Sequence, residues 1–159
     1  MYAPAEVMAV SPRLTTTRTP GIATEEGQCM SNDEEKIRRT LAEYCQHLDN
    51  RHFEEYAGTF TEDGVLDIHD GRAAILSWIK EGALATRPEL RRKHATTNLV
   101  IDVTGDTAHV QSDCVMFDAI GDGPWAIMNQ WRFDDQMQRV GDRWLIKSRK
   151  FIRDLGGVK

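Results

Sequence analysis

The stretch that decides the fold is Tyr44-Cys45-Gln46-His47-Leu48-Asp49, at the end of the first clear amphipathic helix. Apolar side chains lead into it at helical spacing: Ile37, Leu41, Tyr44, Cys45 and Leu48. At about 100° per residue, Asp49 falls on the edge of this stripe. Its position predicts a carboxylate that reaches into a cavity. The alternative interpretation is that Asp49 caps the next turn.

The periodicity outward from this helix predicts an α+β domain over residues 31–159. The first helix is predicted to start at a capping box in residues 31–34, where Ser is followed three residues later by Glu. Further helices are predicted near 53–59 and 73–82, a short strand near 65–68, and four strands near 94–103, 107–119, 125–140 and 144–153. Helices followed by antiparallel strands, without βαβ alternation, argue against a Rossmann-type sheet.

Residues 1–30 have little periodicity and contain Pro4, Pro12 and Pro20, so a disordered or loosely ordered leader is predicted. An upstream extension of the reading frame is an open alternative, since Met30 is a natural start. A transit peptide is another, because Arg13 and Arg18 lie in a Thr-rich, acid-free part. The first ten residues lack the basic start of a secretory signal.

Composition excludes several classes of protein. The 159 residues are 40% hydrophobic and 28% charged, as in one ordinary globular domain. A net charge of -5 argues against nucleic acid as a partner. No apolar run approaches the ~20 residues of a membrane span. Three cysteines without a C-x-x-C spacing predict a reducing cytoplasm and neither disulfides nor a thiolate metal site.

Two further clusters of polar residues are interpreted as solvent-exposed. Asp67, His69 and Asp70 have the look of a metal cluster, but their place at a strand-to-turn edge favours a solvated hairpin. The basic run 91–93 is interpreted as a solvated face. His94, which alternates with basic and polar neighbours, has by itself the alternative of a solvent-exposed position.

The strand near 125–140 predicts a sheet covered on both sides. Trp125, Ile127, Trp131 and Phe133 are expected on one face, and Ala126 and Met128 on the other. A strand apolar on both faces is typical of double coverage. The helices are expected to cover one face of the sheet, and a second copy of the chain is expected to cover the other face. This predicts a homodimer through the sheet.

Several local motifs occur in a familiar order: Tyr44-x4-Asp49, residues 60–65 (FTEDGV), Gly71-Arg72-x2-Ile75, His94-x3-Asn98 and residues 141–146 (GDRWLI). Together they resemble the SnoaL-like family, the cone-shaped α+β barrel of nuclear transport factor 2 type, over about residues 33–154. The resemblance implies three helices packed on a curved, mostly antiparallel sheet. Function follows less directly, because this fold hosts many activities.

The resemblance implies a catalytic pair. Scytalone dehydratase, bile acid 7α-dehydratase and hexachlorocyclohexane dehydrochlorinase use an Asp from the first helix and a His from a mid-sheet strand, and Asp49 and His94 fall at those positions. Tyr44 and Arg153 match a tyrosine and an arginine of the bile acid enzyme. The second histidine of scytalone dehydratase has no counterpart in residues 115–119, and the acidic residue of the bile acid enzyme has only Asp113 nearby, three residues away.

This pattern predicts a cofactor-independent, metal-independent lyase or isomerase. The candidates are a dehydratase, a ketosteroid-isomerase-like enzyme or a cyclase, acting on a hydrophobic, ring-containing molecule such as a steroid or polyketide. The catalytic candidates are Asp49, His94, Tyr44 and Arg153; the substrate-binding candidates are Asn98, Trp131 and Asp113. Asn98, four residues after His94, is expected to share its face of the strand. Tyr44 as a core residue and Arg153 as an exposed one are alternatives. A non-catalytic small-molecule-binding module, or the structural β subunit of a ring-hydroxylating dioxygenase, is the alternative function.

Overall fold

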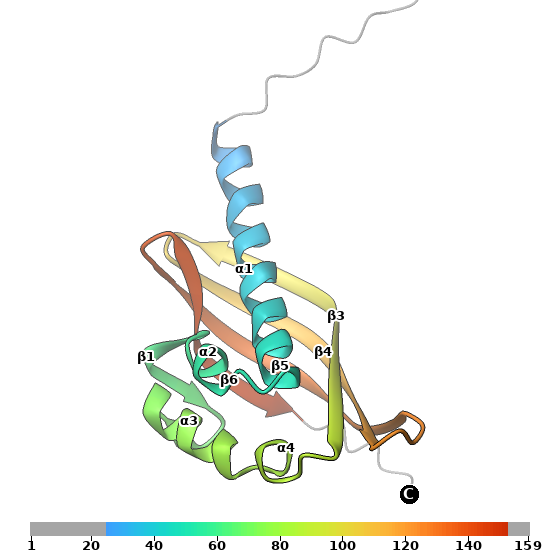
Figure 1. The fold of residues 1–159 in the computed structure, drawn as a ribbon. Coiled ribbons are helices and arrows are strands. Elements are labelled where there is room, and N and C mark those ends of the chain that lie inside the picture. The colour runs from blue at the N-terminus through green and yellow to red at the C-terminus, as the bar shows by residue number, and fades with distance from the viewer. Residues whose placement is uncertain (1–24, 153–159) are drawn as a thin grey trace, which may run out of the picture.

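The structure is a computed structural model that describes residues 25–152. A curved six-stranded sheet is covered on one face by helices (Figure 1). The helices are α1 (Glu25–Asp49), α2 (Phe53–Ala57), α3 (Arg72–Glu81) and α4 (Ala83–Thr86). The strands are β1 (Phe60–Leu66), β2 (His69–Asp70), β3 (Leu90–Thr104), β4 (Thr107–Ile120), β5 (Ala126–Val140) and β6 (Arg143–Ile152).

The strand order is β2-β1-β6-β5-β4-β3, with β1 parallel to β6 and all other pairs antiparallel. The predicted α+β class, with helices on a mostly antiparallel sheet, is confirmed. The sheet is open rather than closed into a barrel, because β2 and β3 are its two edges. The single-turn α4 was not predicted, since one turn is too short to show a helical period.

Helix α1 buries the predicted stripe against the sheet: Ile37, Leu41, Tyr44, Cys45 and Leu48 are all buried. The predicted start at residues 31–34 is wrong, because the helix runs through them from Glu25. Asp33 has another role. Its carboxylate accepts hydrogen bonds from the Arg139 guanidinium at 2.6 and 2.7 Å and from Trp144 Nε1 at 3.1 Å. Asp33 therefore joins α1 to β5 and β6. Residues 1–24 of the predicted leader lie outside the described residues.

We expect Asp33→Asn to reduce the free energy of unfolding by about 1–3 kcal/mol at neutral pH, because buried donors lose a charged acceptor. The hydrogen bond from Arg139 holds the pKa of Asp33 below its usual value. A lowered folded-state pKa stabilises the fold above the unfolded pKa of about 3.9 and loses that contribution as the pH falls through the folded value. Urea unfolding of both proteins at neutral and acid pH measures the difference, which should shrink in acid.

The control for this prediction is Asp122→Asn, in the exposed turn between β4 and β5, which should leave unfolding unchanged at both pH values. A stability difference for Asp33→Asn that stays constant down to acid pH would contradict the assignment of Asp33 as a buried, charged partner of Arg139.

Two of the register shifts in the sheet change where predicted side chains lie. The first lies between Thr97 and Val100 in β3, where Asn98 has a positive φ of 54°. The second is in β5, where Ile127 pairs with Phe117 but Asn129 pairs with Met116. A bulge reverses the alternation of a strand. The predicted faces are therefore wrong for Trp125, which precedes the strand, and for Ile127, which lies on the outer face and is 67% exposed.

Candidate active site

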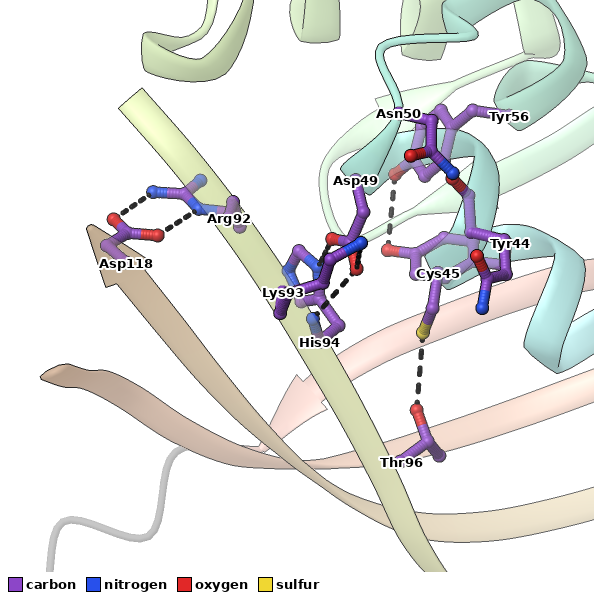
Figure 2. A network of polar contacts seen from close by, with 11 residues as sticks. Tyr44, Cys45, Asp49, Asn50, Tyr56, Arg92, Lys93, His94, Thr96 and Asp118 are labelled. Carbon is purple, nitrogen blue, oxygen red and sulfur yellow. Dashed lines mark hydrogen bonds and ion pairs between the residues drawn. The ribbon is translucent and has the colours of Figure 1, made fainter. Parts of the chain in front are cut away.

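Asp49 and His94 meet at the end of α1 (Figure 2). The Nδ1 atom of His94 lies 2.7 Å from Asp49 Oδ1, and the backbone N–H of His94 donates to Asp49 Oδ2 at 3.1 Å. Each side chain is only 5% exposed. Both oxygens of the carboxylate are thus engaged by one residue of β3, and the imidazole is held in a single orientation.

This geometry selects the tautomer of His94. A carboxylate accepts the ring proton at Nδ1, so the lone pair of the neutral imidazole lies on Nε2. The ring lines a cavity of about 570 Å³, within the usual range for small-molecule sites. A base oriented in this way can take a proton from a ligand while the carboxylate stabilises the imidazolium that forms.

The cavity is lined chiefly by aromatic and apolar side chains, which suits a hydrophobic ring system. They come from α1, α2, α3 and three strands: Tyr44, Leu48, Tyr56, Trp78, Ile79, Met116, Trp131, Phe133 and Phe151. Trp131, a predicted substrate-binding residue, is among them. The polar lining residues besides the tyrosines are Asp67, His69, Arg92 and His94.

Tyr44 and Tyr56 form a pair of phenols in the cavity wall. The Tyr56 hydroxyl donates to the Tyr44 hydroxyl at 3.2 Å. Burial raises the pKa of Tyr44, and it raises the pKa of Tyr56 well above the usual value. Both phenols are therefore protonated near neutral pH. Because Tyr44 accepts from Tyr56, its own proton is available to an oxygen of a ligand. Tyr56 was not among the predicted site residues.

A buried ion pair packs against the ring of Tyr44. Arg149 in β6 donates to Asp135 in β5 at 2.6 and 2.8 Å, and both side chains are at most 1% exposed. The guanidinium carbon of Arg149 lies 4.1 Å from the ring centroid of Tyr44 and 4.0 Å from the ring centroid of Phe133. Burial acts to lower the pKa of Arg149, but the Asp135 carboxylate outweighs it and leaves the pKa raised. The sequence showed no sign of this pair.

Asn98 and Asp113 lie apart from the cavity around His94. Asn98 sits at the bulge of β3, so the expected shared face with His94 is lost. Its amide donates to Asp113 Oδ2 at 2.9 Å, and Arg132 Nε donates to Asp113 Oδ1 at 2.9 Å. These three residues line a separate hollow of about 470 Å³, which touches the main cavity only at Trp131. Arg153 lies outside the described residues.

The structure adds residues to the cavity that the sequence assigned to solvent. Arg92, taken as part of a solvated run, lines it, and so do Asp67 and His69 of the predicted hairpin. The ring of His69 stacks on that of Trp78 with centroids 4.8 Å apart. The sequence did contain a signal that Arg92 lines the cavity: it lies two residues before His94, and alternate residues of a strand share a face.

Cys45 and Cys114 are buried thiols. Cys45 Sγ lies 3.3 Å from the Thr96 hydroxyl. Burial raises the pKa of Cys45 and raises that of Cys114 to about 12. Both are protonated at neutral pH, and a protonated thiol is a poor nucleophile.

Within residues 25–152, no group of three or more His, Cys, Asp or Glu side chains is arranged to hold a metal ion. Asp67, His69 and Asp70 are not arranged as such a group. No helix of this part of the chain is both long and apolar enough to cross a membrane.

The chain belongs to the family of SnoaL-like domain proteins, whose family model matches residues 30–150. No curated protein matches the sequence. Among solved structures, a protein from Catenulispora acidiphila in complex with S-DNPA is similar, with 28% identity, a TM-score of 0.68, and coverage of 76% of this chain and 92% of the other.

Two less identical structures share the fold. ActVI-ORFA from Streptomyces coelicolor has 22% identity and a TM-score of 0.67, over 77% of this chain and 95% of the other. A protein from Novosphingobium aromaticivorans, provisionally assigned as a scytalone dehydratase, has 24% identity and a TM-score of 0.70, over 80% of this chain and 88% of the other. These two likenesses show that the fold is shared.

Proposed function

We propose that this chain is a cofactor-independent lyase or isomerase that acts on a hydrophobic, ring-containing small molecule by Asp49–His94 acid–base chemistry. The observation that carries the proposal is the 2.7 Å contact between Asp49 and His94 Nδ1 at the wall of a largely aromatic cavity. Dehydration, isomerisation and cyclisation of such a molecule each begin with removal of a proton, usually beside a carbonyl group.

In the proposed mechanism, His94 Nε2 takes the proton and Asp49 stabilises the resulting imidazolium. The Tyr44 hydroxyl, held by Tyr56, donates to the oxygen on which negative charge develops. The imidazolium then returns its proton to a leaving hydroxyl, which gives elimination of water, or to another carbon, which gives isomerisation. Trp131 packs against the rings of the substrate. Each step uses only groups of this chain.

The test is incubation of the purified protein with hydroxylated and keto-substituted polycyclic compounds, followed by mass spectrometry. Elimination lowers the product mass by one water, while isomerisation leaves the mass unchanged and alters the chromatographic retention. His94→Gln should abolish either change. A compound that co-purifies with the chain and is released unchanged by wild type and variant alike would favour the alternative, a small-molecule-binding module.

The proposal includes a homodimer through the outer face of the sheet. Val100, Ile127 and Ile152 are 46–67% exposed there, an apolar surface that a second copy would cover. Sedimentation should show a dimer at micromolar concentration, and the double change Val100→Glu and Ile152→Glu should yield monomers. Ile68→Glu, in the turn between β1 and β2, is the control that should leave the dimer intact. A wild-type monomer would refute the dimer.

A further inference from the structure

Arg92 is the only lysine or arginine among the described residues that line the cavity. It lies two residues before His94 on β3, so the two Cα atoms are about 6.5–7 Å apart on one face of the strand. A single ring-containing ligand therefore spans both side chains. Figure 2 shows Arg92 on β3 facing Asp118 on β4, with His94 farther along the same strand.

Asp118 fixes the guanidinium of Arg92. Nε and Nη2 donate to its two oxygens, each at 2.7 Å, and the side chains are 19% and 11% exposed. The residues are also direct register partners in the sheet. Asp118 accepts two of the roughly five N–H groups of a guanidinium, which leaves the Nη1 edge for another oxygen. The donor is rigid before a ligand arrives, which lowers the entropic cost of binding.

The charge of this donor is already compensated. Asp118 neutralises Arg92, and Asp67 adds a second carboxylate to the lining of the same cavity. A ligand carboxylate bound to Arg92 would lie close to the Asp118 carboxylate in a partly buried site, where repulsion is poorly screened. A neutral carbonyl, phenol or alcohol oxygen gains the hydrogen bonds without that repulsion.

We infer that Arg92 binds a neutral oxygen at the end of the substrate away from His94, and that Asp118 excludes substrates with a carboxylate at that position. This inference rests on the proposed function, because it places the substrate in the cavity beside His94. It assigns the substrate class: a ring system with oxygen substituents at two separated positions, one presented to His94 and Tyr44 and the other to Arg92.

The experiment is isothermal titration calorimetry with three stable probes: 2-naphthol, 2,7-dihydroxynaphthalene and 7-hydroxy-2-naphthoate. Wild-type protein should bind the dihydroxy compound about tenfold more tightly than 2-naphthol, the value of one good hydrogen bond to a charged donor. It should bind the carboxylate no better than the dihydroxy compound. Arg92→Leu should abolish the gain from the second hydroxyl.

Asp118→Asn is the decisive variant, because it keeps the shape of the side chain and removes its charge. It should shift the preference toward 7-hydroxy-2-naphthoate by about tenfold, since Arg92 is then uncompensated. A merely structural pair would not change this preference. If Arg92→Leu folds poorly, the double change Arg92→Leu and Asp118→Leu removes both charges and should also lose the gain from the second hydroxyl.

Arg91→Leu is the matched control. Arg91 directly precedes Arg92 on β3, but its guanidinium lies over the Trp125 ring and donates to the Gly123 carbonyl, away from the cavity. It should leave all three affinities unchanged. Equal wild-type binding of 2-naphthol and the dihydroxy compound, or an unchanged preference in Asp118→Asn, would overturn the inference but not the proposed function. Failure of all three probes to bind would count against both.

Discussion

His94→Gln is expected to lower kcat by about 10²–10⁴-fold on any substrate that the wild-type chain converts, because a positioned general base contributes that much. Glutamine keeps a polar side chain of similar reach but has no basic nitrogen. Asp49→Asn should cause a loss in the same range. The amide offers a donor as well as an acceptor, so it no longer selects the tautomer with its lone pair on Nε2. Steady-state kinetics with a confirmed substrate measures both losses.

The same kinetic comparison includes one variant with a smaller expected loss of kcat and one control variant. Tyr44→Phe should lower kcat by about 10²–10³-fold, the usual loss on removing one donor to a developing oxyanion. His52→Gln, which changes an exposed histidine just after α1, should leave kcat unchanged. Circular dichroism of each variant establishes that the fold persists. If His94→Gln and Asp49→Asn both keep near wild-type turnover, the acid–base role of the pair is refuted.

Arg149→Met is expected to reduce the free energy of unfolding by about 3–5 kcal/mol, because it leaves the Asp135 carboxylate buried without its partner. Asp135 is 0% exposed and both its oxygens accept from Arg149, so water cannot replace the lost donors without opening the core. The variant also removes the cation between the rings of Tyr44 and Phe133. Urea unfolding followed by circular dichroism measures the change.

The double variant Arg149→Met and Asp135→Leu separates the cost of an unpaired charge from the contribution of the pair. It removes both charges and should recover much of the loss, as apolar replacements of buried pairs often do. Arg143→Met is the control on the same strand: its exposed contact with Glu43 is worth only about 0–1 kcal/mol. A single Arg149→Met variant as stable as the wild type would contradict the cost assigned to a buried, unpaired Asp135 carboxylate.

The candidate site was partly predictable because two of its members lie on regular elements. Asp49 follows an uninterrupted helical stripe, and His94 lies on β3 before the bulge, where alternation still reports the face. The pairing of these two residues came from the resemblance to the SnoaL-like family, not from periodicity. Trp131 also lies in an unbroken part of its strand and lines the cavity as expected.

The errors occur where the regular pattern is interrupted. Asn98 was placed on the face of His94 by counting in steps of two, and the bulge with its positive φ turned it away. Ile127 was misplaced for the same reason in β5. The true start of α1 was missed because residues 31–34 look like a capping box in the sequence, whereas the helix continues through them. The Asp33 carboxylate instead accepts hydrogen bonds from Arg139 and Trp144, about a hundred positions later.

The sequence by itself determined the α+β class, the presence of the longer helices and strands, and the stripe that carries Tyr44 and Asp49, because local periodicity encodes these features. The tertiary structure alone decided the strand order, the parallel pairing of β1 with β6, and the Arg149–Asp135 and Arg92–Asp118 pairs. The physical reason is that such contacts depend on the register between distant strands. One bulge shifts that register without leaving a periodic signal in the sequence.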